Sequence, residues 1–194
     1  MDEWEAGPMM ALIEPATAAD APLLAQVLLA AWLETYPNEA AGIDEAWIRE
    51  QRGDVVSADG VARWREVVER SVRAPGELPP PVFCRVVRVE GQIVGLLCGL
   101  RDERDAGAVT LGPMYLLARA QGRGIGRRLL EQFLDWAGEA RIRLWVTAYN
   151  DQAVRFYTRH GFRPTGEEML WQGRLPNLRM ERPPGVVPLD GERP

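Results

Sequence analysis

Three glycines alternate along a short turn between an apolar strand and an amphipathic helix, and this feature limits the possible folds most. They are Gly122, Gly124 and Gly126, and the run before them, 109–117, is rich in β-branched and apolar residues. After them, apolar side chains recur at helical intervals as far as Leu134. Glycine lets a backbone turn sharply and approach a ligand closely, and the first N–H groups of a helix lack internal partners. The sequence therefore predicts an anion-binding turn suited to a pyrophosphate.

Two familiar phosphate motifs fit this turn poorly. A Walker A loop requires Gly-Lys-Ser/Thr, and the segment has no lysine. A dinucleotide fingerprint, G-x-G-x-x-G, requires glycine where this chain has Arg127, and it belongs to an early parallel βαβ unit. A nucleotide-binding or oxidoreductase module is therefore disfavoured, whereas a purely structural role for the turn stays open. Positive charge surrounds the turn at Arg119, Arg123, Arg127 and Arg128.

The second half of the chain alternates β-rich runs with helical ones. The β-rich runs are 82–89, 93–100, 109–117, 141–149 and a final pair near 162–171 and 178–181. A loop and a helix are expected at 121–140, and a second helix at 151–160. Glu90-Gly91 and residues 102–107 separate the first three runs as hairpin turns would, which predicts an antiparallel meander. The expected fold is α/β, a single domain with a mixed central sheet (the meander plus a parallel βαβ) flanked by helices.

The first half of the chain is predicted to be mainly helical. A short strand at 11–14 precedes Thr17 and Asp20, two plausible N-caps for a helix that ends at Pro37. A second helical zone runs from about 43 to 72, and we expect interruptions near Gly53 and Gly60. The predicted organisation is a flexible extension at 1–9, one domain at 10–182 and a flexible Pro-rich tail at 183–194.

Composition narrows the class of protein. The 194 residues carry a net charge of −5, which argues against a broad basic surface for nucleic acid. No apolar segment is long enough to span a membrane, and the acidic start is unlike a secretory signal, so we expect a cytoplasmic protein. Cys84 and Cys98 fit reduced core thiols. Because His160 is the only histidine, no metal centre is expected.

Two motifs carry a resemblance to a known family. The spacing Gln121-x-x-Gly124-x-Gly126 resembles the acyl-CoA signature, Q/R-x-x-G-x-G/A, of the GCN5-related N-acetyltransferases. About 24 residues downstream, the segment 150–162 is similar to the family's N-x-x-A-x-x-F/L-Y…G-F element, with Tyr157 at its tyrosine. Both motifs occur in the family's order and at its separation. The resemblance covers about 10–182 and is strongest at 109–165.

The resemblance implies acetyl-CoA as cosubstrate and assigns roles to individual residues. The Leu116 N–H would face the thioester oxygen, and Tyr157 would be the general acid that protonates the departing thiolate. Where the family usually has proline, this chain has Ala118, which removes no donor. The implied coenzyme-binding residues are Leu116, Leu117, Ala118, Gln121, Gly122, Arg123, Gly124, Ile125, Gly126, Arg127, Asn150, Ala153 and Tyr157. Asn150 can also be read as a helix N-cap, and Tyr157 as a core aromatic.

The acceptor side has no motif of its own. Three carboxylates, Glu34, Asp44 and Glu45, lie in the segment expected to form the acceptor wall, and any of them could act through water as the general base. Each can equally be a solvated charge, and His160 reads as structural. A turn at 37–39 could form a lid. Candidate lining residues are Trp32, Tyr36, Trp47, Trp64 and Trp171.

The predicted function is acetyl transfer from acetyl-CoA to a primary amine by direct attack in a ternary complex. The motif region offers no activated nucleophile, which argues against an acyl-enzyme. The alternative is a non-catalytic acyl-CoA-binding regulatory domain. Expected partners are acetyl-CoA and a small-molecule or peptide amine, with no nucleic acid and no membrane; a homodimer is possible. The acidic balance of the whole chain mildly favours a cationic acceptor.

Overall fold

The computed structural model describes residues 10–72, 80–102, 105 and 107–185, which fold around one seven-stranded sheet. The strand order is β1-β2-β3-β4-β5-β7-β6. Strands β4 and β5 pair in parallel, and the other neighbouring pairs are antiparallel. This confirms the expected α/β class, in which an antiparallel meander joins a parallel βαβ unit.

The elements follow the predicted order. The strands are β1 (Ala11–Pro15), β2 (Val82–Val89), β3 (Gln92–Arg101), β4 (Ala108–Leu116), β5 (Arg141–Thr147), β6 (Arg163–Trp171) and β7 (Leu175–Arg182). The helices are α1 (Ala21–Thr35), α2 (Glu45–Arg52), α3 (Ala58–Glu69), α4 (Ile125–Ala137) and α5 (Asp151–Arg159). Short 3-10 turns lie at η1 (Ala18–Asp20), η2 (Glu39–Ala41), η3 (Gly53–Val56) and η4 (Ala118–Ala120).

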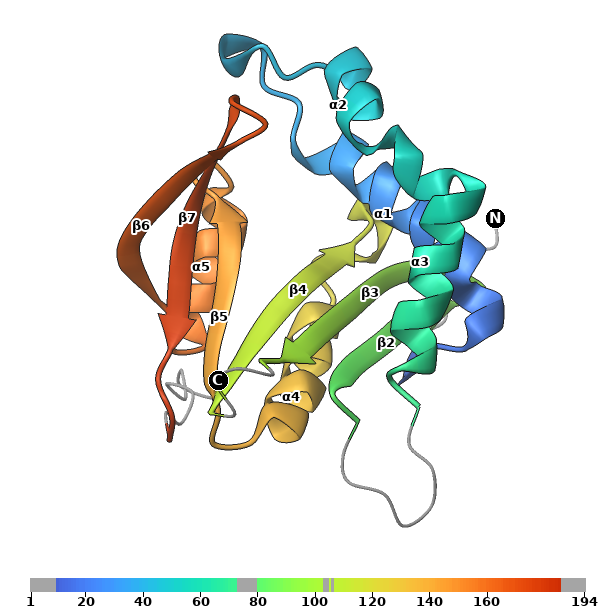
Figure 1. Ribbon diagram of the computed structural model, residues 1–194, viewed down its shortest axis with the longest axis vertical. Coiled ribbons are helices and arrows are strands. Elements are labelled where there is room, and N and C mark those ends of the chain that lie inside the picture. The colour runs from blue at the N-terminus through green and yellow to red at the C-terminus, as the bar shows by residue number, and fades with distance from the viewer. Residues whose placement is uncertain (1–9, 73–79, 103–104, 106, 186–194) are drawn as a thin grey trace, which may run out of the picture.

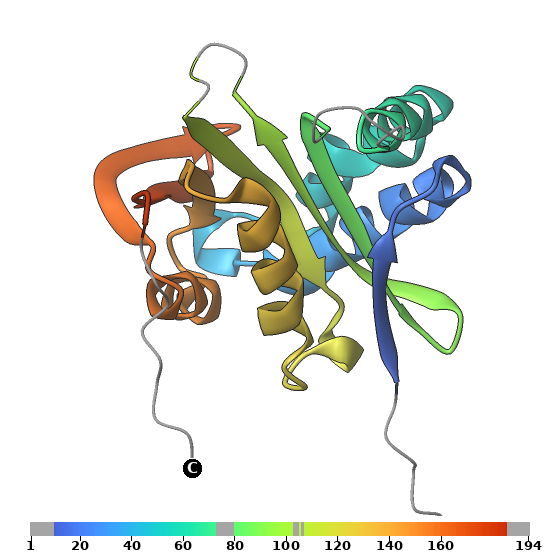
Figure 2. The same cartoon turned by 90° about the horizontal axis from the view of Figure 1, so that it is seen from below.

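Helices cover the two faces of the sheet, so the core has two layers (Figure 1, Figure 2). The α1–α3 layer packs on one face through residues such as Leu24, Ile48 and Leu96. The α4–α5 layer packs on the other through residues such as Phe133 and Phe162. Successive residues of a strand point to opposite faces of the sheet, so alternate strand side chains belong to one core layer or to the other.

Strands β4 and β5 part soon after they meet, and this separation creates the opening at which the candidate site lies (Figure 1). They pair only over 108–110 and 141–143. In the β3–β4 ladder, Leu97 faces Met114 while Gly99 faces Leu111, so β4 carries an extra residue near Pro113. A bulge bends its strand, and proline has no N–H to offer a ladder. The β4 edge from 111 to 116 is therefore left unpaired by β5.

One predicted boundary is wrong. Gly60 does not interrupt a helix but lies inside α3. A Cβ atom added there would lie 2.2 Å from the Val55 carbonyl oxygen, so glycine permits a close approach between α3 and η3 rather than a break. The break near Gly53 is confirmed, because η3 begins there. β7 also begins three residues before the predicted run, at Leu175.

Other expectations concern the hairpin turn, the cysteines and the chain ends. Glu90 and Gly91 both have positive φ, as a tight hairpin turn requires. Cys84 and Cys98 are buried free thiols that face each other across β2 and β3. The predicted extension at 1–9 and residues 186–194 of the predicted tail lie outside the described residues.

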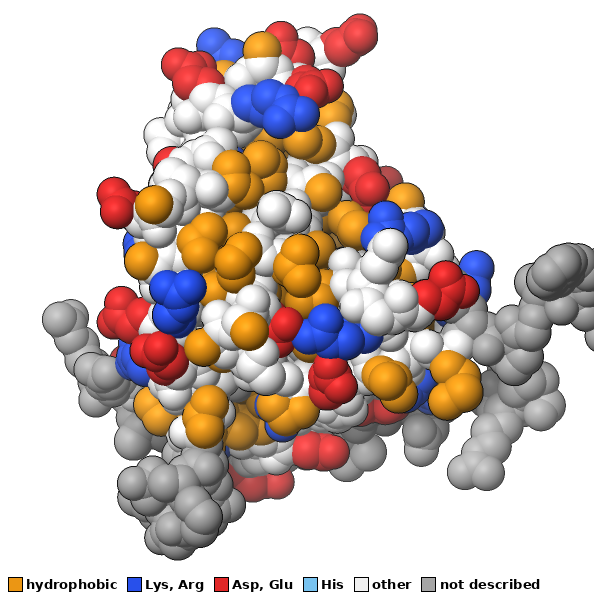
Figure 3. All heavy atoms as spheres, turned by 90° about the vertical axis from the view of Figure 1, so that its right-hand side faces the viewer, with side chains coloured by type: hydrophobic (Ala, Val, Ile, Leu, Met, Phe, Trp, Pro, Cys, Tyr) orange, Lys and Arg blue, Asp and Glu red, His pale blue; other side chains and the backbone are white. Residues whose placement is uncertain are grey.

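The face formed over the helices α1 to α3 carries mixed charges, with red and blue side chains interspersed among orange ones (Figure 3). Within the described part of the chain, no helix is both long and apolar enough to cross a membrane. In that same part, no group of three or more His, Cys, Asp or Glu side chains is arranged to hold a metal ion.

Candidate active site

The glycine-rich turn leads from β4 into α4. Gly122 and Gly124 have φ of 74° and 71°, which only glycine adopts without strain, and Gly124 is the residue that precedes α4. No side chain of the described residues caps the first N–H groups of α4 at this position. These donors and the positive end of a 13-residue helix therefore face the turn. The arrangement suits a bound phosphate.

Charged side chains around the turn point outward from it. Arg119 donates to the Gln92 side chain (3.4 Å), and Arg127 lies 3.7 Å from Glu131, one turn along α4. Ile125 differs from these in being buried in the α4–α5 layer, which anchors the first turn of the helix. The backbone at the turn is thus fixed by packing, while its arginines lie at the surface.

The unpaired edge of β4 presents the Leu116 N–H to the opening. The next residue, Leu117, donates its N–H to the Val94 carbonyl of β3 (2.9 Å), so by alternation the N–H and C=O of Leu116 point the other way. The Gln121 side chain donates to the Leu116 carbonyl on that same edge (2.8 Å), which agrees with this direction. Because β5 has already separated, the Leu116 N–H is a fixed donor aimed between the strands.

Ala118 makes a different contact from the one the resemblance implies. Its N–H donates to Glu34 Oε2 at 2.8 Å, so α1 reaches across to the end of β4. The resemblance assigns Leu116, Leu117 and Ala118 to coenzyme binding, and the N–H groups of Leu117 and Ala118 have partners within the protein.

Tyr157 lies on the opposite side of the opening, on α5. Its residue is only 8% exposed, and its ring packs against Phe156 and Phe162. The hydroxyl makes no hydrogen bond within the described part of the chain, yet it is not among the fully buried unpartnered atoms there. Burial, and secondarily nearby Tyr36, raises the pKa of the Tyr157 phenol, so it stays protonated at neutral and alkaline pH.

Three other residues of the downstream motif lie at the two ends of α5. Asn150 is its N-cap, and its Oδ1 accepts the Ala153 N–H at 3.0 Å. This leaves the amide nitrogen of Asn150 available to a ligand. His160 Nδ1 lies 2.8 Å from the Phe156 carbonyl oxygen, and Gly161 has φ of 86° just past the helix end. These contacts make His160 and Gly161 part of the α5 C-terminus.

All four tyrosines of the chain gather at the opening, and Tyr36 connects its two sides. The Tyr36 hydroxyl shares a 2.8 Å hydrogen bond with the Tyr115 hydroxyl of β4. Its carbonyl accepts the Tyr149 O–H from the end of β5, also at 2.8 Å. Burial raises the pKa values of Tyr36 and Tyr115, and it raises that of Tyr149 to about 12. The end of α1 thus bridges the strands that have separated.

Tryptophan rings pack next to Tyr36 and extend the aromatic cluster outward from the tyrosines. The ring centroid of Trp32 lies 4.6 Å from that of Tyr36 and 5.0 Å from that of Trp171. Trp47 lies 5.9 Å from Trp171. The β6–β7 hairpin therefore packs against α1 and α2 above the opening. Trp64 belongs to the same apolar layer but makes no ring contact with these aromatics in the described structure.

The three carboxylates proposed as the base occupy different positions. Asp44 caps α2 by accepting the Trp47 N–H (2.8 Å), and Glu45 pairs with Arg49 on the helix surface. Both contacts are typical of ordinary helix starts. Of the three, only Glu34 accepts a hydrogen bond in the described structure from the turn that follows β4, through the Ala118 N–H of η4.

Coenzyme A fits the residues on the α4 side of the opening. A Cβ atom added at Gly126 would lie 3.5–3.9 Å from Leu116, Phe156 and Met114, so the first turn of α4 faces the gap between β4 and α5. The capless helix start, the glycine turn and the Leu116 edge thus form one continuous path. The start of α4 and the glycine turn would hold the pyrophosphate, and the Leu116 edge of β4 would hold the pantetheine arm and the thioester.

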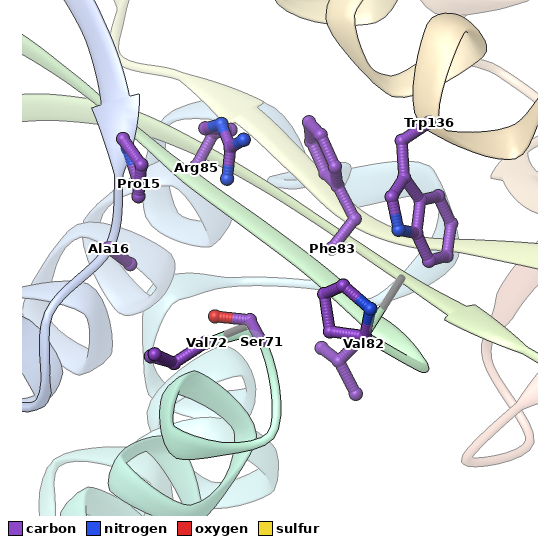
Figure 4. A pocket seen from close by; sticks show the side chains of 9 residues that line it. Pro15, Ala16, Ser71, Val72, Val82, Phe83, Arg85 and Trp136 are labelled. Atoms are coloured by element: carbon purple, nitrogen blue, oxygen red, sulfur yellow. The ribbon is translucent and has the colours of Figure 1, made fainter. Parts of the chain in front are cut away.

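A separate hollow lies far from this path, at the other end of α4. In Figure 4, Phe83 and Arg85 extend from β2 toward it, and Trp136 extends from α4. Trp136 is near the C-terminus of α4, whereas the glycine turn is at its N-terminus. The hollow is therefore not part of the candidate site.

Sequence reasoning missed Tyr115, Tyr149 and Arg52 as residues of the site. Arg52 ends α2, and its guanidinium carbon lies 4.7 Å from the centroid of the Trp32 ring. The position of Tyr115 could have been predicted from one feature of the sequence. It immediately precedes Leu116 in a strand, so its side chain must point to the face opposite the Leu116 side chain. Nothing local in the sequence marks the other two, because tertiary packing alone brings them to the opening.

Comparisons with known proteins bear on the family of the chain. The sequence profile of the Acetyltransferase (GNAT) family matches residues 43–162. The chain is 32% identical over 91 residues to the 5-NmdU N-acetyltransferase of Pseudomonas phage PaMx11, across 47% of this chain and 64% of that protein. It is 34% identical over 87 residues to the spermine/spermidine N(1)-acetyltransferase of Bacillus subtilis (strain 168), across 40% of this chain and 57% of that protein. Both matches span less than two thirds of the relative's length.

Among solved structures, the fold resembles the PaiA N-acetyltransferase from Thermoplasma acidophilum in complex with coenzyme A. The TM-score is 0.69 at 21% identity, over 90% of this chain and 99% of that one. A likeness at this identity concerns the fold. Because the family profile covers more than half of the chain, the protein belongs to the GNAT acetyltransferase family, as its two motifs predicted.

Proposed function

We propose that the protein transfers an acetyl group from acetyl-CoA to an amine, by direct attack in a ternary complex. The observation that carries this proposal is the pair of groups on either side of the opening. On one side is the Leu116 N–H, on a β4 edge that β5 has left; on the other is the Tyr157 hydroxyl, which makes no hydrogen bond within the described residues. Names of relatives that include N-acetyltransferase support the same reading.

Bound acetyl-CoA would supply the acetyl group and a thiolate leaving group. The amine nitrogen forms a C–N bond as the C–S bond breaks, so the amine must lose a proton and the sulfur must be stabilised. Leu116 N–H would donate to the carbonyl oxygen as negative charge develops there. Tyr157 O–H would donate to the departing sulfur, and because burial keeps its pKa high, it holds this proton at working pH.

Glu34 is the carboxylate that we propose as acceptor of the amine proton, acting through water. Its Oε2 is fixed by the Ala118 N–H, two residues beyond Leu116. The side chain is exposed, so solvent can carry the proton away. Asp44 and Glu45 are less suited, because they serve the start and surface of α2.

Release of free thiol from acetyl-CoA, measured with a panel of amines, tests the proposal. The chain contains no lysine, so acetylation of its own ε-amines cannot contribute to the signal. Replacement Tyr157→Phe is expected to lower kcat by about 100-fold while the Kd for acetyl-CoA stays unchanged. Unchanged turnover in Y157F would remove Tyr157 from the mechanism.

A non-catalytic acyl-CoA-binding domain is the alternative. It predicts acetyl-CoA binding without amine-dependent thiol release. In that case Y157F would change neither binding nor any measured rate.

A further inference from the structure

Arg52 is a cation held by aromatic rings instead of a counter-ion. Its guanidinium carbon lies 4.7 Å from the Trp32 ring centroid and 5.8 Å from that of Trp171. Within the described residues it forms no ion pair and no hydrogen bond, and its Nε is buried without a partner. The rings thus fix the guanidinium, and its two terminal nitrogens remain as donors for a ligand.

Trp32, beside Arg52, also has a buried nitrogen donor without a hydrogen-bond partner among the described residues. The residue is 7% exposed, and the donor is its indole Nε1. Buried donors normally have acceptors, and a half-buried charge normally has an opposite charge nearby. Both nitrogens, Arg52 Nε and Trp32 Nε1, are buried, so a ligand would meet the terminal nitrogens of Arg52, which are not among the buried unpartnered atoms of the described structure. The lack of a counter-ion among the described residues indicates that this wall can receive an anionic group.

The charges around the opening are arranged with opposite signs at its two ends. Near β4 lie Glu34 and the C-terminal end of α1, where helix carbonyls carry partial negative charge. On the outer wall, Arg174 joins Arg52: it lies 5.8 Å from the Trp47 ring and donates to the Gly42 carbonyl (2.8 Å). Neither arginine has a carboxylate within 4.0 Å in the described part of the chain. An amine would be favoured at the β4 end, and an anion at the other.

We infer that the acceptor is a small amine that also carries a carboxylate, with the carboxylate bound by Arg52 and the amino group directed toward Leu116. This inference rests on the proposed function and specifies its substrate class. It runs against the weak preference for cationic acceptors that the net charge suggests, because the charges of one wall outweigh the average of the surface. The contacts of Trp171 with Trp32 and Trp47 join the β6–β7 hairpin to α1 and α2 beside Arg52, and in this proposal the acceptor is a small molecule and not a polypeptide.

A purely structural role for Arg52 makes a different prediction. Arg52 is the last residue of α2, where a cation stabilises the helix dipole. Loss of that role would lower the melting temperature and slow all acceptors alike. Loss of a carboxylate-binding role would instead slow acceptors that carry the carboxylate much more than those that lack it.

The test compares matched acceptors, L-amino acids with their amides and with spermidine, in the thiol-release assay. For the wild-type protein, we expect kcat/KM for an amino acid to exceed that of its amide by about 10- to 100-fold. Arg52→Gln should remove this preference by lowering kcat/KM for the amino acid much more than for its amide, while Arg52→Lys should retain part of the preference. Arg63→Gln is the control, because Arg63 is an exposed arginine on α3 that pairs with Asp54.

Binding gives a second readout that does not require turnover. Amino acids and amides are titrated into the CoA-saturated wild-type and R52Q proteins. Arg52-dependent binding of the amino acid without any thiol release would uphold the inference and remove the transferase proposal. Equal or better use of spermidine or of the amides would overturn the inference and leave the transferase standing. If no acceptor binds and none reacts, both are wrong.

Discussion

In the proposed mechanism, the two walls of the opening between β4 and β5 would recognise their ligands by different means. The coenzyme wall is continuous in sequence and offers main-chain groups: the Leu116 N–H, the glycine turn and the start of α4. The acceptor wall is assembled from α1, α2 and the β6–β7 hairpin, and it offers side chains such as Tyr36, Trp32 and Arg52. Main-chain donors bind a phosphate whatever the neighbouring side chains are, whereas side chains define one acceptor. The coenzyme site can thus stay constant while the acceptor changes.

The largest expected effect comes from a substitution at Gly124, and it distinguishes a loss of acetyl-CoA binding from a loss of stability of α4. Gly124→Ala strains the backbone at φ 71° and is expected to weaken acetyl-CoA binding by at least about 100-fold, because the strained turn no longer directs its N–H groups at the phosphate. The cost in stability should be roughly 1–2 kcal/mol. Calorimetry and thermal melting measure the two effects.

Gly138→Ala is the matched control at the opposite end of the same helix. Gly138 also has positive φ (62°), and a Cβ atom added there meets nothing within 4 Å, as at Gly124. We expect G138A to destabilise the protein and leave acetyl-CoA binding intact. Equal losses of binding in both variants would mean that the turn acts only through folding.

The next effect concerns the junction of the two walls, where Glu34 holds the Ala118 N–H. Glu34→Gln keeps a hydrogen-bond acceptor but cannot take a proton, so kcat is expected to fall about tenfold with little change in acetyl-CoA affinity. Glu45→Gln on α2 should leave kcat unchanged. Wild-type kcat in E34Q would exclude Glu34 as the base.

A smaller effect separates the two roles of Asn150. Asn150→Ala should cost about 1 kcal/mol of stability, because the Ala153 N–H loses its cap. Asn150→Asp keeps the cap but loses the amide N–H groups. If the side chain also contacts coenzyme A, N150D should raise the KM for acetyl-CoA while its melting temperature stays near wild type. An unchanged KM in both variants would limit Asn150 to its capping role.

The smallest expected effect is seen at high pH, on the acceptor wall. Burial raises the pKa of Tyr149 from about 10 to about 12, so its contribution to stability is complete below pH 10 and is lost between pH 10 and 12. Tyr149→Phe lacks this ionisation. Its melting temperature should therefore fall less between pH 9 and 11 than that of the wild type. A parallel fall in both proteins would contradict the raised pKa of the partly buried Tyr149.

Sequence reasoning reached the coenzyme wall because that wall is local. Gln121, Gly124 and Tyr157 occur at fixed spacings, and such spacing is visible without a structure. Arg52 and Trp171 meet only after α2 and the β6–β7 hairpin pack together, which no local pattern encodes. The prediction of a break at Gly60 was wrong for a related reason. In the sequence, a glycine inside a helical segment looks like a break, whereas the close approach of Gly60 to Val55 is visible only in the folded structure.

The central claim is that the Leu116–Arg127 segment binds acetyl-CoA, and calorimetric titration of the purified protein with acetyl-CoA tests it most directly. NADH serves as the control ligand, because a pyrophosphate alone would be common to both. The account predicts saturable binding of acetyl-CoA at one site per chain, abolished in G124A and kept in G138A, with no comparable binding of NADH. Absence of acetyl-CoA binding, or equal binding of NADH, would contradict it.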